Sequence, residues 1–187
     1  TVLSNEDSQG GKCDRYGSEV VQVDRDVWFL KMKEYSEKLL GNVDRIEMAE
    51  NLKDAQRNWI GKSEGVELKL DVVDEDNNKL DTIKIFTTCI ETVYGITYVV
   101  LAPEHNLVNN LSSKITNLDE VKEYKEKTAF KSDFDRISQV KDKSGCRLQG
   151  LYAINPVNNA RVPMYLADYV LAGYGTGAVM AVPSHDQ

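Results

Sequence analysis

The chain has 187 residues, which is enough for one substantial domain or for a domain with an extension. Hydrophobic residues make up 41% and charged residues 28%, a balance that excludes a wholly disordered or collagen-like chain. The net charge of −7 provides no overall positive field, so any contact with a polynucleotide must be local, for example at one end of a strand.

The three cysteines, Cys13, Cys89 and Cys146, are far apart and form no CxxC pair. This spacing favours free thiols in a reducing compartment such as the cytoplasm, with neither a disulfide framework nor a zinc site. The sequence also contains no run of about eighteen apolar residues, so we expect no membrane segment. Because the chain lacks an initial Met and stops directly after an apolar run, we interpret it as a piece of a longer protein.

The first third of the chain predicts a polar arm over residues 1–17, a short strand over residues 19–23 and two helices. The first helix is expected between Asp24 and Gly41, and the second spans roughly residues 48–59. Each has an apolar stripe at helical spacing: Trp28, Met32, Tyr35 and Leu39 in the first, and Met48, Leu52, Ala55 and Trp59 in the second. We interpret both tryptophans as core residues.

The pattern changes to alternation after Gly65, which predicts strands over residues 66–72 and 80–87 with a turn at 74–78. A buried strand is expected over residues 97–101, and Asn117 with Glu120 resembles a capping box that begins a helix. Short apolar runs then alternate with turns: residues 151–154, 162–166, 169–173 and 178–182. The predicted fold class is α+β, with helices first and then a sheet or barrel that has peripheral helices.

Local motifs taken singly are weak. Gly61–Gly65 has the G-x-S-x-G spacing of a hydrolase elbow around Ser63, but a helix precedes it and a strand follows, the reverse of that motif's context. Gly173–Gly177 has glycines at alternate positions, which suits either a tight turn or a backbone that approaches a ligand. Three hydroxyl residues, Thr87, Thr88 and Thr92, follow a strand and can hold a water or a sugar hydroxyl.

Taken together, the segments resemble leucyl-tRNA synthetases of the bacterial and organellar type, in order and over nearly the whole chain. The matching segments are Trp28–Lys31 with Tyr35 and Leu39–Leu40, Gln56–Gly65, Phe86–Thr88 with Thr92, Tyr94–Gly95, Leu101–His105, Tyr152–Pro156, Ala167–Val170 and Tyr174–Gln187.

The resemblance implies a domain organisation. Residues 1–60 would be an arm and helices that link to the class I catalytic domain, and residues 61–187 would be a C-terminally truncated editing domain, a β-barrel with surrounding helices. The ATP-site signatures HIGH and KMSKS are absent from the chain. ATP and Mg would therefore serve the parent enzyme, which charges leucine tRNA, and this segment would need no cofactor and no metal.

The resemblance also implies a mechanism, the hydrolysis of the ester that joins a wrong amino acid to the terminal adenosine of leucine tRNA. A hydrophobic pocket discriminates one methylene by only about 1–3 kcal/mol, which is why such proofreading exists. Thr87 and Thr88 would contact substrate and water, and Thr92 would exclude leucine; with Asp186 these form the expected catalytic set. The expected substrate-binding residues are Tyr174, Gly175, Gly177, Met180, Val182 and His185.

The sequence departs from the family pattern at Cys89-Ile90-Glu91, where members of the family usually have Arg-Pro-Asp. The chain also stops before the Asp that holds the ammonium group of the substrate. Two alternatives therefore stay open beside editing. One is a module that binds the acceptor end without hydrolysis, and the other, ranked last, is an esterase that uses Ser63.

Overall fold

The computed structural model describes residues 2–3, 7, 11–21, 26–129, 131, 136, 144–173 and 175–186. The chain divides into two compact units. One unit, called here the hairpin unit, comprises Val23–Glu64, and the other, the sheet unit, comprises Thr1–Gln22 together with Gly65–Gln187. The organisation expected from the sequence, with residues 1–60 as a link and 61–187 as an editing domain, stays a prediction.

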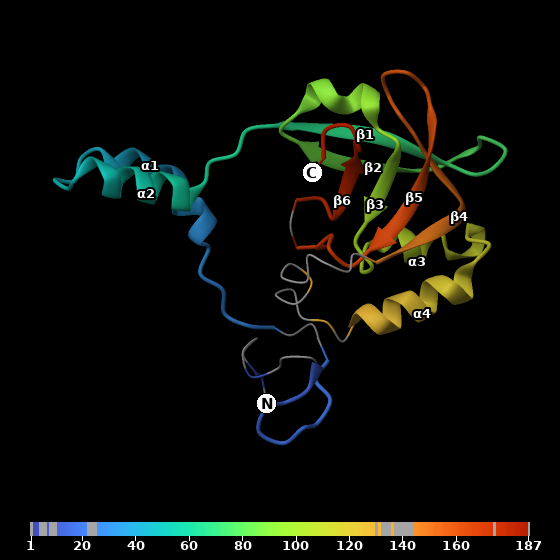
Figure 1. Ribbon diagram of the computed structural model, residues 1–187, viewed down its shortest axis with the longest axis horizontal. Helices are drawn as coiled ribbons and strands as arrows, with labels where there is room; N and C mark the ends of the chain where they lie inside the picture. Colours follow the sequence, from blue (N-terminus) through green and yellow to red (C-terminus); the bar gives the residue numbers. More distant parts are fainter. Residues whose placement is uncertain are drawn as a thin grey trace. The chain divides into compact units, whose positions relative to one another are not determined.

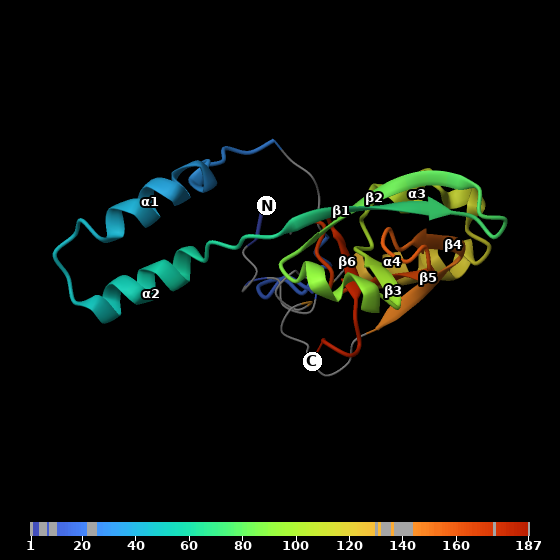
Figure 2. The same cartoon turned by 90° about the horizontal axis from the view of Figure 1, so that it is seen from above.

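The hairpin unit consists of a short 3-10 helix η2 (Met32–Tyr35) and two helices, α1 (Ser36–Val43) and α2 (Glu50–Ile60), which lie side by side (Figure 2). The second predicted helix is confirmed. The first begins later than predicted and runs through Gly41 to Val43, while residues 26–31 are not helical. An amphipathic stripe needs a packing partner to stabilise a helix, and Trp28 is fully exposed.

The sheet unit is built on six strands: β1 (Val66–Val73), β2 (Lys79–Thr87), β3 (Tyr98–Leu101), β4 (Gly145–Ile154), β5 (Arg161–Ala167) and β6 (Ala178–Ala181) (Figure 1). Their order in the sheet is β2-β1-β4-β5-β3-β6, and every neighbouring pair is antiparallel except β3 with β5. The strands predicted from alternation are therefore confirmed. Their inward residues, including Leu70, Ile85, Leu148 and Leu166, form one continuous core.

The α+β class is confirmed, and the sheet is open rather than closed into a barrel. The two edge strands, β2 and β6, lie in contact, yet no ladder of hydrogen bonds joins them in the described part of the chain. The sheet therefore curves enough to bring β2 and β6 into contact.

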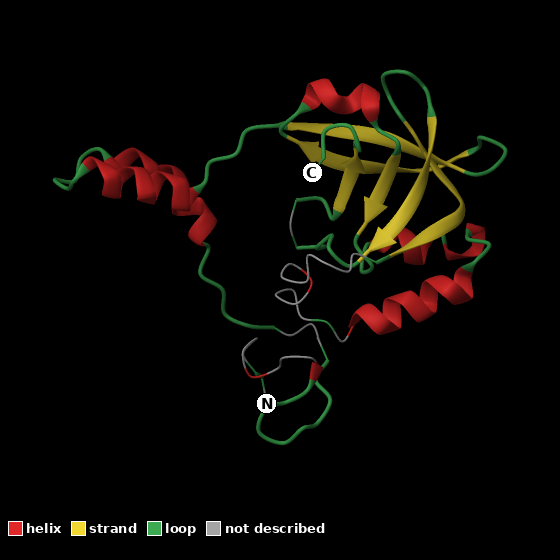
Figure 3. Cartoon of the chain, viewed as in Figure 1, coloured by secondary structure: helices red, strands yellow, loops and turns green. Residues whose placement is uncertain are grey.

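Short helices cover the sheet (Figure 3): η3 (Ile90–Gly95), α3 (Asn106–Asn110), η4 (Ser112–Lys114) and α4 (Leu118–Ala129). The predicted start of α4 is confirmed, and Asn117 donates to Glu120 Oε2 at 2.7 Å. Asn117 also fixes this helix start to β4, since its amide donates to the Arg147 carbonyl and accepts from the Gln149 N–H.

Three other sequence expectations are wrong. Residues 169–173 form turns rather than a strand, and Glu19 makes only an isolated bridge with Lys12; Gln22, Val23 and Asp24 lie outside the described residues. Neither tryptophan is a core residue, because Trp59 is 90% exposed and Trp28 is fully exposed. Within the described residues, no helix combines the length and apolar character needed to cross a bilayer.

Candidate functional site

The three predicted threonines lie on one short segment, Thr87–Thr92, called here the threonine loop. Thr87 is the last residue of β2 and pairs with Val66, the first residue of β1. Thr88 is exposed and begins the turn out of the sheet, whereas Thr92 is half-buried within η3. The end of a regular strand and a tight helical turn thus hold the three side chains.

The backbone of Cys89 connects two of these threonines. Its N–H donates to Thr87 Oγ1 at 3.1 Å, and its carbonyl accepts from both the N–H and the hydroxyl of Thr92, at 3.1 and 2.8 Å. Because these bonds use the backbone, they do not depend on which side chain occupies position 89. The hydrogen bonds that order Thr87 and Thr92 are therefore independent of the Cys89 side chain.

The hydrogen bonds give the threonines different chemical capacities. The Thr92 hydroxyl proton is committed to the Cys89 carbonyl, so what this side chain offers a ligand is chiefly its bulk. Thr87 accepts through its oxygen, and within the described residues its proton has no protein acceptor, so it remains available to a water or a substrate oxygen. The Thr88 hydroxyl lies 3.7 Å from the Cys89 thiol, a weak partner for either role.

The second set of predicted residues lies on β6 and the turn that follows it. Met180 is half-buried on β6, and Val182 is buried directly after it. Asp186 Oδ2 accepts from the Val182 N–H at 2.7 Å, and the N–H groups of His185 and Asp186 both donate to the Val182 carbonyl. His185 lies 3.7 Å from the Asp186 carboxylate, with both side chains about half exposed. In this conformation the Asp186 carboxylate stabilises its own turn.

In the glycine segment before β6, residues 173–177, the backbone of Gly177 lies close to neighbouring atoms. Gly177 has φ of +68°, and a Cβ there would lie 3.3 Å from Ala172 Cα and 3.4 Å from His105 Cδ2. Its carbonyl accepts from the Ala102 N–H, which ties the segment to the end of β3. Gly175 has φ of +60° and open space around it. Tyr174 lies outside the described residues.

The fold brings η3, which contains Thr92, next to the turn after β6. Gly95, the last residue of η3, is so close to Val182 that a Cβ on it would lie 2.9 Å from Val182 Cγ1, with Ser184 Oγ at 3.8 Å. At the start of the threonine loop, a Cβ on Gly65 would lie 2.4 Å from the Thr87 carbonyl oxygen, so only glycine fits at position 65. The predicted Thr92 and Val182 therefore belong to adjacent segments.

Two residues that sequence analysis did not single out support this arrangement. Asn155, in the turn after β4, is fully buried and donates to the Val93 carbonyl within η3 at 2.8 Å. His105 caps α3 through its Nδ1, which accepts from the Leu107 N–H, and its burial lowers its pKa against the opposing charge of Asp81. The Asn-Pro pair at 155–156 was a visible turn signal, but sequence spacing does not reveal a partner 62 residues away.

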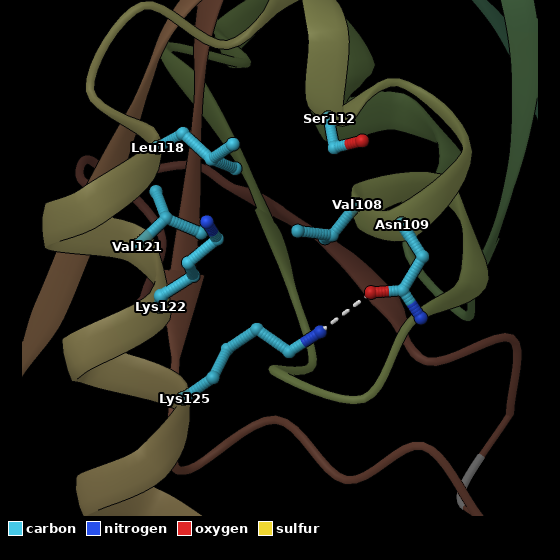
Figure 4. A pocket seen from close by; sticks show the side chains of 7 residues that line it. All are labelled: Val108, Asn109, Ser112, Leu118, Val121, Lys122 and Lys125. Carbon is cyan, nitrogen blue, oxygen red and sulfur yellow. Dashed lines mark hydrogen bonds between the residues drawn. The ribbon is translucent and has the colours of Figure 1, made fainter.

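A pocket of about 270 Å³ lies between α3 and α4, and Figure 4 shows the side chains around it. Its lining includes Val108, Leu118 and Val121, while the Lys125 ammonium donates to Asn109 Oδ1 across it. No predicted site residue lines this pocket. Among the described residues there is also no cluster of three His, Cys, Asp or Glu side chains that could hold a metal ion.

The context of Ser63 does not fit a nucleophile elbow. Gly61 ends α2, and Ser63 is exposed in the irregular connection before β1. A nucleophile elbow needs a strand before the serine and a helix after it, so the order of elements is reversed here.

Comparisons with known proteins agree with the geometry. The family model described as "Leucyl-tRNA synthetase, editing domain" matches residues 57–187. The chain is 41% identical over 184 residues to the leucine–tRNA ligase of Alkaliphilus oremlandii (strain OhILAs), and 43% identical over 187 residues to that of Clostridium kluyveri. These matches cover 98% and 100% of the chain but only 22% of each relative.

A solved structure agrees as well, the ternary complex of Agrobacterium radiobacter K84 agnB2 LeuRS with tRNA and LeuAMS. It matches with a TM-score of 0.66 and 35% identity over 98% of this chain and 22% of that one. The family model covers well over half of the sequence, and all six strands and the threonine loop lie inside the matched range. The chain belongs to the leucyl-tRNA synthetase editing-domain family.

Proposed function

We propose that this segment hydrolyses the ester of mischarged leucine tRNA, as part of a longer leucine–tRNA ligase. The observation that supports this most directly is the threonine loop, in which the backbone of Cys89 orders the side chains of Thr87 and Thr92, while the η3 helix that contains Thr92 ends next to Val182. The substrate would be the terminal adenosine of leucine tRNA esterified with a wrong amino acid. Charging of the tRNA with ATP and Mg would belong to the rest of the longer protein.

The chemistry needs a positioned water and donors for the developing oxyanion. The water oxygen attacks the ester carbonyl carbon, the bond to the ribose oxygen breaks, and a proton from the water ends on that ribose oxygen. The available Thr87 proton suits the carbonyl oxygen or the water, and the exposed Thr88 adds a second hydroxyl. Thr92, whose proton is already committed, acts by bulk and excludes the leucine side chain.

The second set of residues would bind the acceptor end. The glycines at 175 and 177 would admit the adenosine close to the backbone, and Tyr174, Met180 and Val182 would line the pocket. His185 and Asp186 would close it, with Asp186 at the turn that its own carboxylate stabilises.

The hairpin unit would connect this domain to the rest of the ligase. Trp28, Phe29, Leu30 and Trp59 are all at least 84% exposed, a concentration of aromatic and aliphatic surface that is unusual for a free-standing helical pair. We also propose a cytoplasmic location, which the free thiols of Cys13, Cys89 and Cys146 support.

A deacylation assay on the complete ligase tests the function. We expect the wild type to hydrolyse leucine tRNA charged with isoleucine or norvaline, and Thr87→Val to slow this hydrolysis by roughly ten- to a hundredfold through loss of one hydrogen bond to the developing oxyanion. Binding of uncharged leucine tRNA without any ester hydrolysis would instead favour the acceptor-end module. As a matched control, Thr82→Val removes a hydroxyl that faces Asp71 elsewhere on β2 and should leave the rate unchanged.

Specificity is tested at Thr92. In the complete ligase, Thr92→Ala removes the bulk that excludes leucine and should make the enzyme hydrolyse correctly charged leucine tRNA. The measurement is the half-life of the leucyl ester with wild type and variant. A leucyl ester as stable with the variant as with the wild type, while the mischarged ester is still cleared, contradicts this role.

A further inference from the structure

The turn between β4 and β5 is built around one buried amide side chain. Asn155 is 0% exposed, its Oδ1 accepts from the Val157 N–H at 3.0 Å, and its backbone N–H donates to the Ala160 carbonyl. These hydrogen bonds hold the turn together. They leave the Nδ2 group to reach outside the turn, where it donates to the Val93 carbonyl at 2.8 Å.

The partner of this amide is the residue that follows Thr92. Val93 is buried in the core, and its carbonyl also accepts from the Ile96 N–H at 3.3 Å within η3. Thr92 is held on its other side by the Cys89 carbonyl. The threonine thus lies between two anchors, one at Cys89 inside its own loop and one at Val93 that comes from the distant β4–β5 turn.

A second, longer hydrogen bond also joins the β4–β5 turn to η3. Asn158 in the same turn donates from Nδ2 to the Tyr94 carbonyl at 3.4 Å, while its Oδ1 accepts from the Ala160 N–H at 2.9 Å. Two amides of one turn therefore contact two successive carbonyls of η3. Because the first amide is fully buried, its loss would leave the Val93 carbonyl with a poorer partner where water has little access.

We propose that Asn155 is a positioning residue that sets the place of Thr92 and thereby the exclusion of leucine from the editing pocket. This rests on the proposed function. A side chain that works by bulk must be held to a fraction of an ångström, so loss of the anchor at Val93 should first blur the discrimination between leucine and the mischarged amino acid. Hydrolysis itself, which relies on Thr87, should change less.

The test compares two esters on the complete ligase: leucine tRNA charged with leucine, and leucine tRNA charged with isoleucine or norvaline. For Asn155→Ala and Asn155→Asp we expect the hydrolysis of the leucyl ester, relative to the mischarged one, to rise roughly three- to tenfold. Asn155→Asp retains an acceptor for the Val157 N–H but replaces the donor to Val93. A gain of hydrolysis is a readout that mere destabilisation would not give.

The matched control is Asn117→Ala. Asn117 also bonds the backbone through both ends of its amide, to Arg147 and Gln149, but at the start of α4 rather than at η3. It should lower stability without raising leucyl ester hydrolysis. Hydrolysis of the mischarged ester by each variant confirms that its editing site is folded. If the Asn155 variants do not accumulate, Asn158→Ala carries the same test, with a smaller rise expected.

The outcomes separate the two proposals. If the wild type clears a mischarged ester and folded variants at 155 keep the wild-type ratio of the two rates, the positioning role is overturned while the function stands. If the wild type clears neither mischarged ester, the proposed function is overturned and the specificity role with it. An equal rise with Asn117→Ala also overturns the positioning role, because the effect would then reflect general loosening.

Discussion

The hairpin unit and the sheet unit treat their apolar side chains in opposite ways. In the sheet unit, residues from all six strands bury one another, and Leu70, Ile85, Leu148 and Leu166 are each 0% exposed. Among the described residues of the hairpin unit, Val43 is the single buried apolar side chain. The same density of large apolar residues therefore produces a core in one unit and an exposed surface in the other.

In the hairpin unit, a cluster of ion pairs around Arg57 joins α2 to the end of α1. Arg57 on α2 donates to Glu50 and Asp54 of its own helix and to Asp44 just after α1. These hydrogen bonds raise the pKa of Arg57, and the bond to Asp44 makes the largest contribution. The comparison teaches that the sheet unit buries its apolar side chains within itself. The hairpin, by contrast, leaves Trp28, Phe29, Leu30 and Trp59 exposed, which is the surface that the proposed link to the rest of the ligase would cover.

The largest expected effect is a core truncation in the sheet unit. Leu148→Ala on β4 should lower the free energy of unfolding of the 187-residue chain by about 2–5 kcal/mol, because a fully buried leucine leaves a cavity. Urea denaturation followed by far-UV circular dichroism measures it. The matched variant is Trp59→Ala, which should change the same quantity by less than about 0.5 kcal/mol. Equal losses for the two variants would contradict the comparison.

A smaller effect is expected from salt on the hairpin. Raising sodium chloride from 0.1 to 1 M shortens the screening length from about 10 to about 3 Å, which weakens the exposed ion pairs of Arg57. Amide hydrogen exchange in α1 and α2 should accelerate roughly two- to fivefold, and exchange in β4 should not change. The variant Arg57→Gln should lose most of this salt response. A response that persists in it would mean that the hairpin is held by something else.

The smallest expected effect is a pH dependence from His105 in the sheet unit. Burial lowers its pKa from the ordinary value of 6.5, so the unfolded chain binds more protons than the folded one as the pH falls through 6.5. The stabilisation is therefore complete above pH 6.5 and is lost progressively as the pH falls below that value. Asp81 opposes the shift, which keeps the effect modest.

The measurement is the free energy of unfolding at pH 7.5 and pH 5 for wild type and His105→Asn. Asparagine retains a capping acceptor for the Leu107 N–H but does not titrate in this range, so the variant should lose less stability on acidification. Identical pH profiles for the two proteins would contradict the assignment to His105.

Much of the fold could be predicted from the sequence because its signals are local. Alternation over residues 66–72 and 80–87 requires only that one face of a strand be buried, and both strands appear as β1 and β2. The turn at 74–78 follows from its own side chains, since Asp74 accepts from the N–H groups of Asp76 and Asn78. The threonines were visible as a group because they are close along the chain.

What tertiary structure alone decided is which distant segments meet and which apolar faces find a partner. Periodicity marked Trp28 and Trp59 as members of apolar stripes, but a stripe does not say what covers it, and here both are exposed. Strand order is also non-local: β4 lies between β1 and β5, and β3 pairs in parallel with β5. The hydrogen bond from Asn155 to Val93 joins residues that are 62 apart in the sequence. Local sequence does not reveal such a contact, because the energy of the whole core, and not that of neighbouring residues, offsets the entropy cost of closing so long a loop.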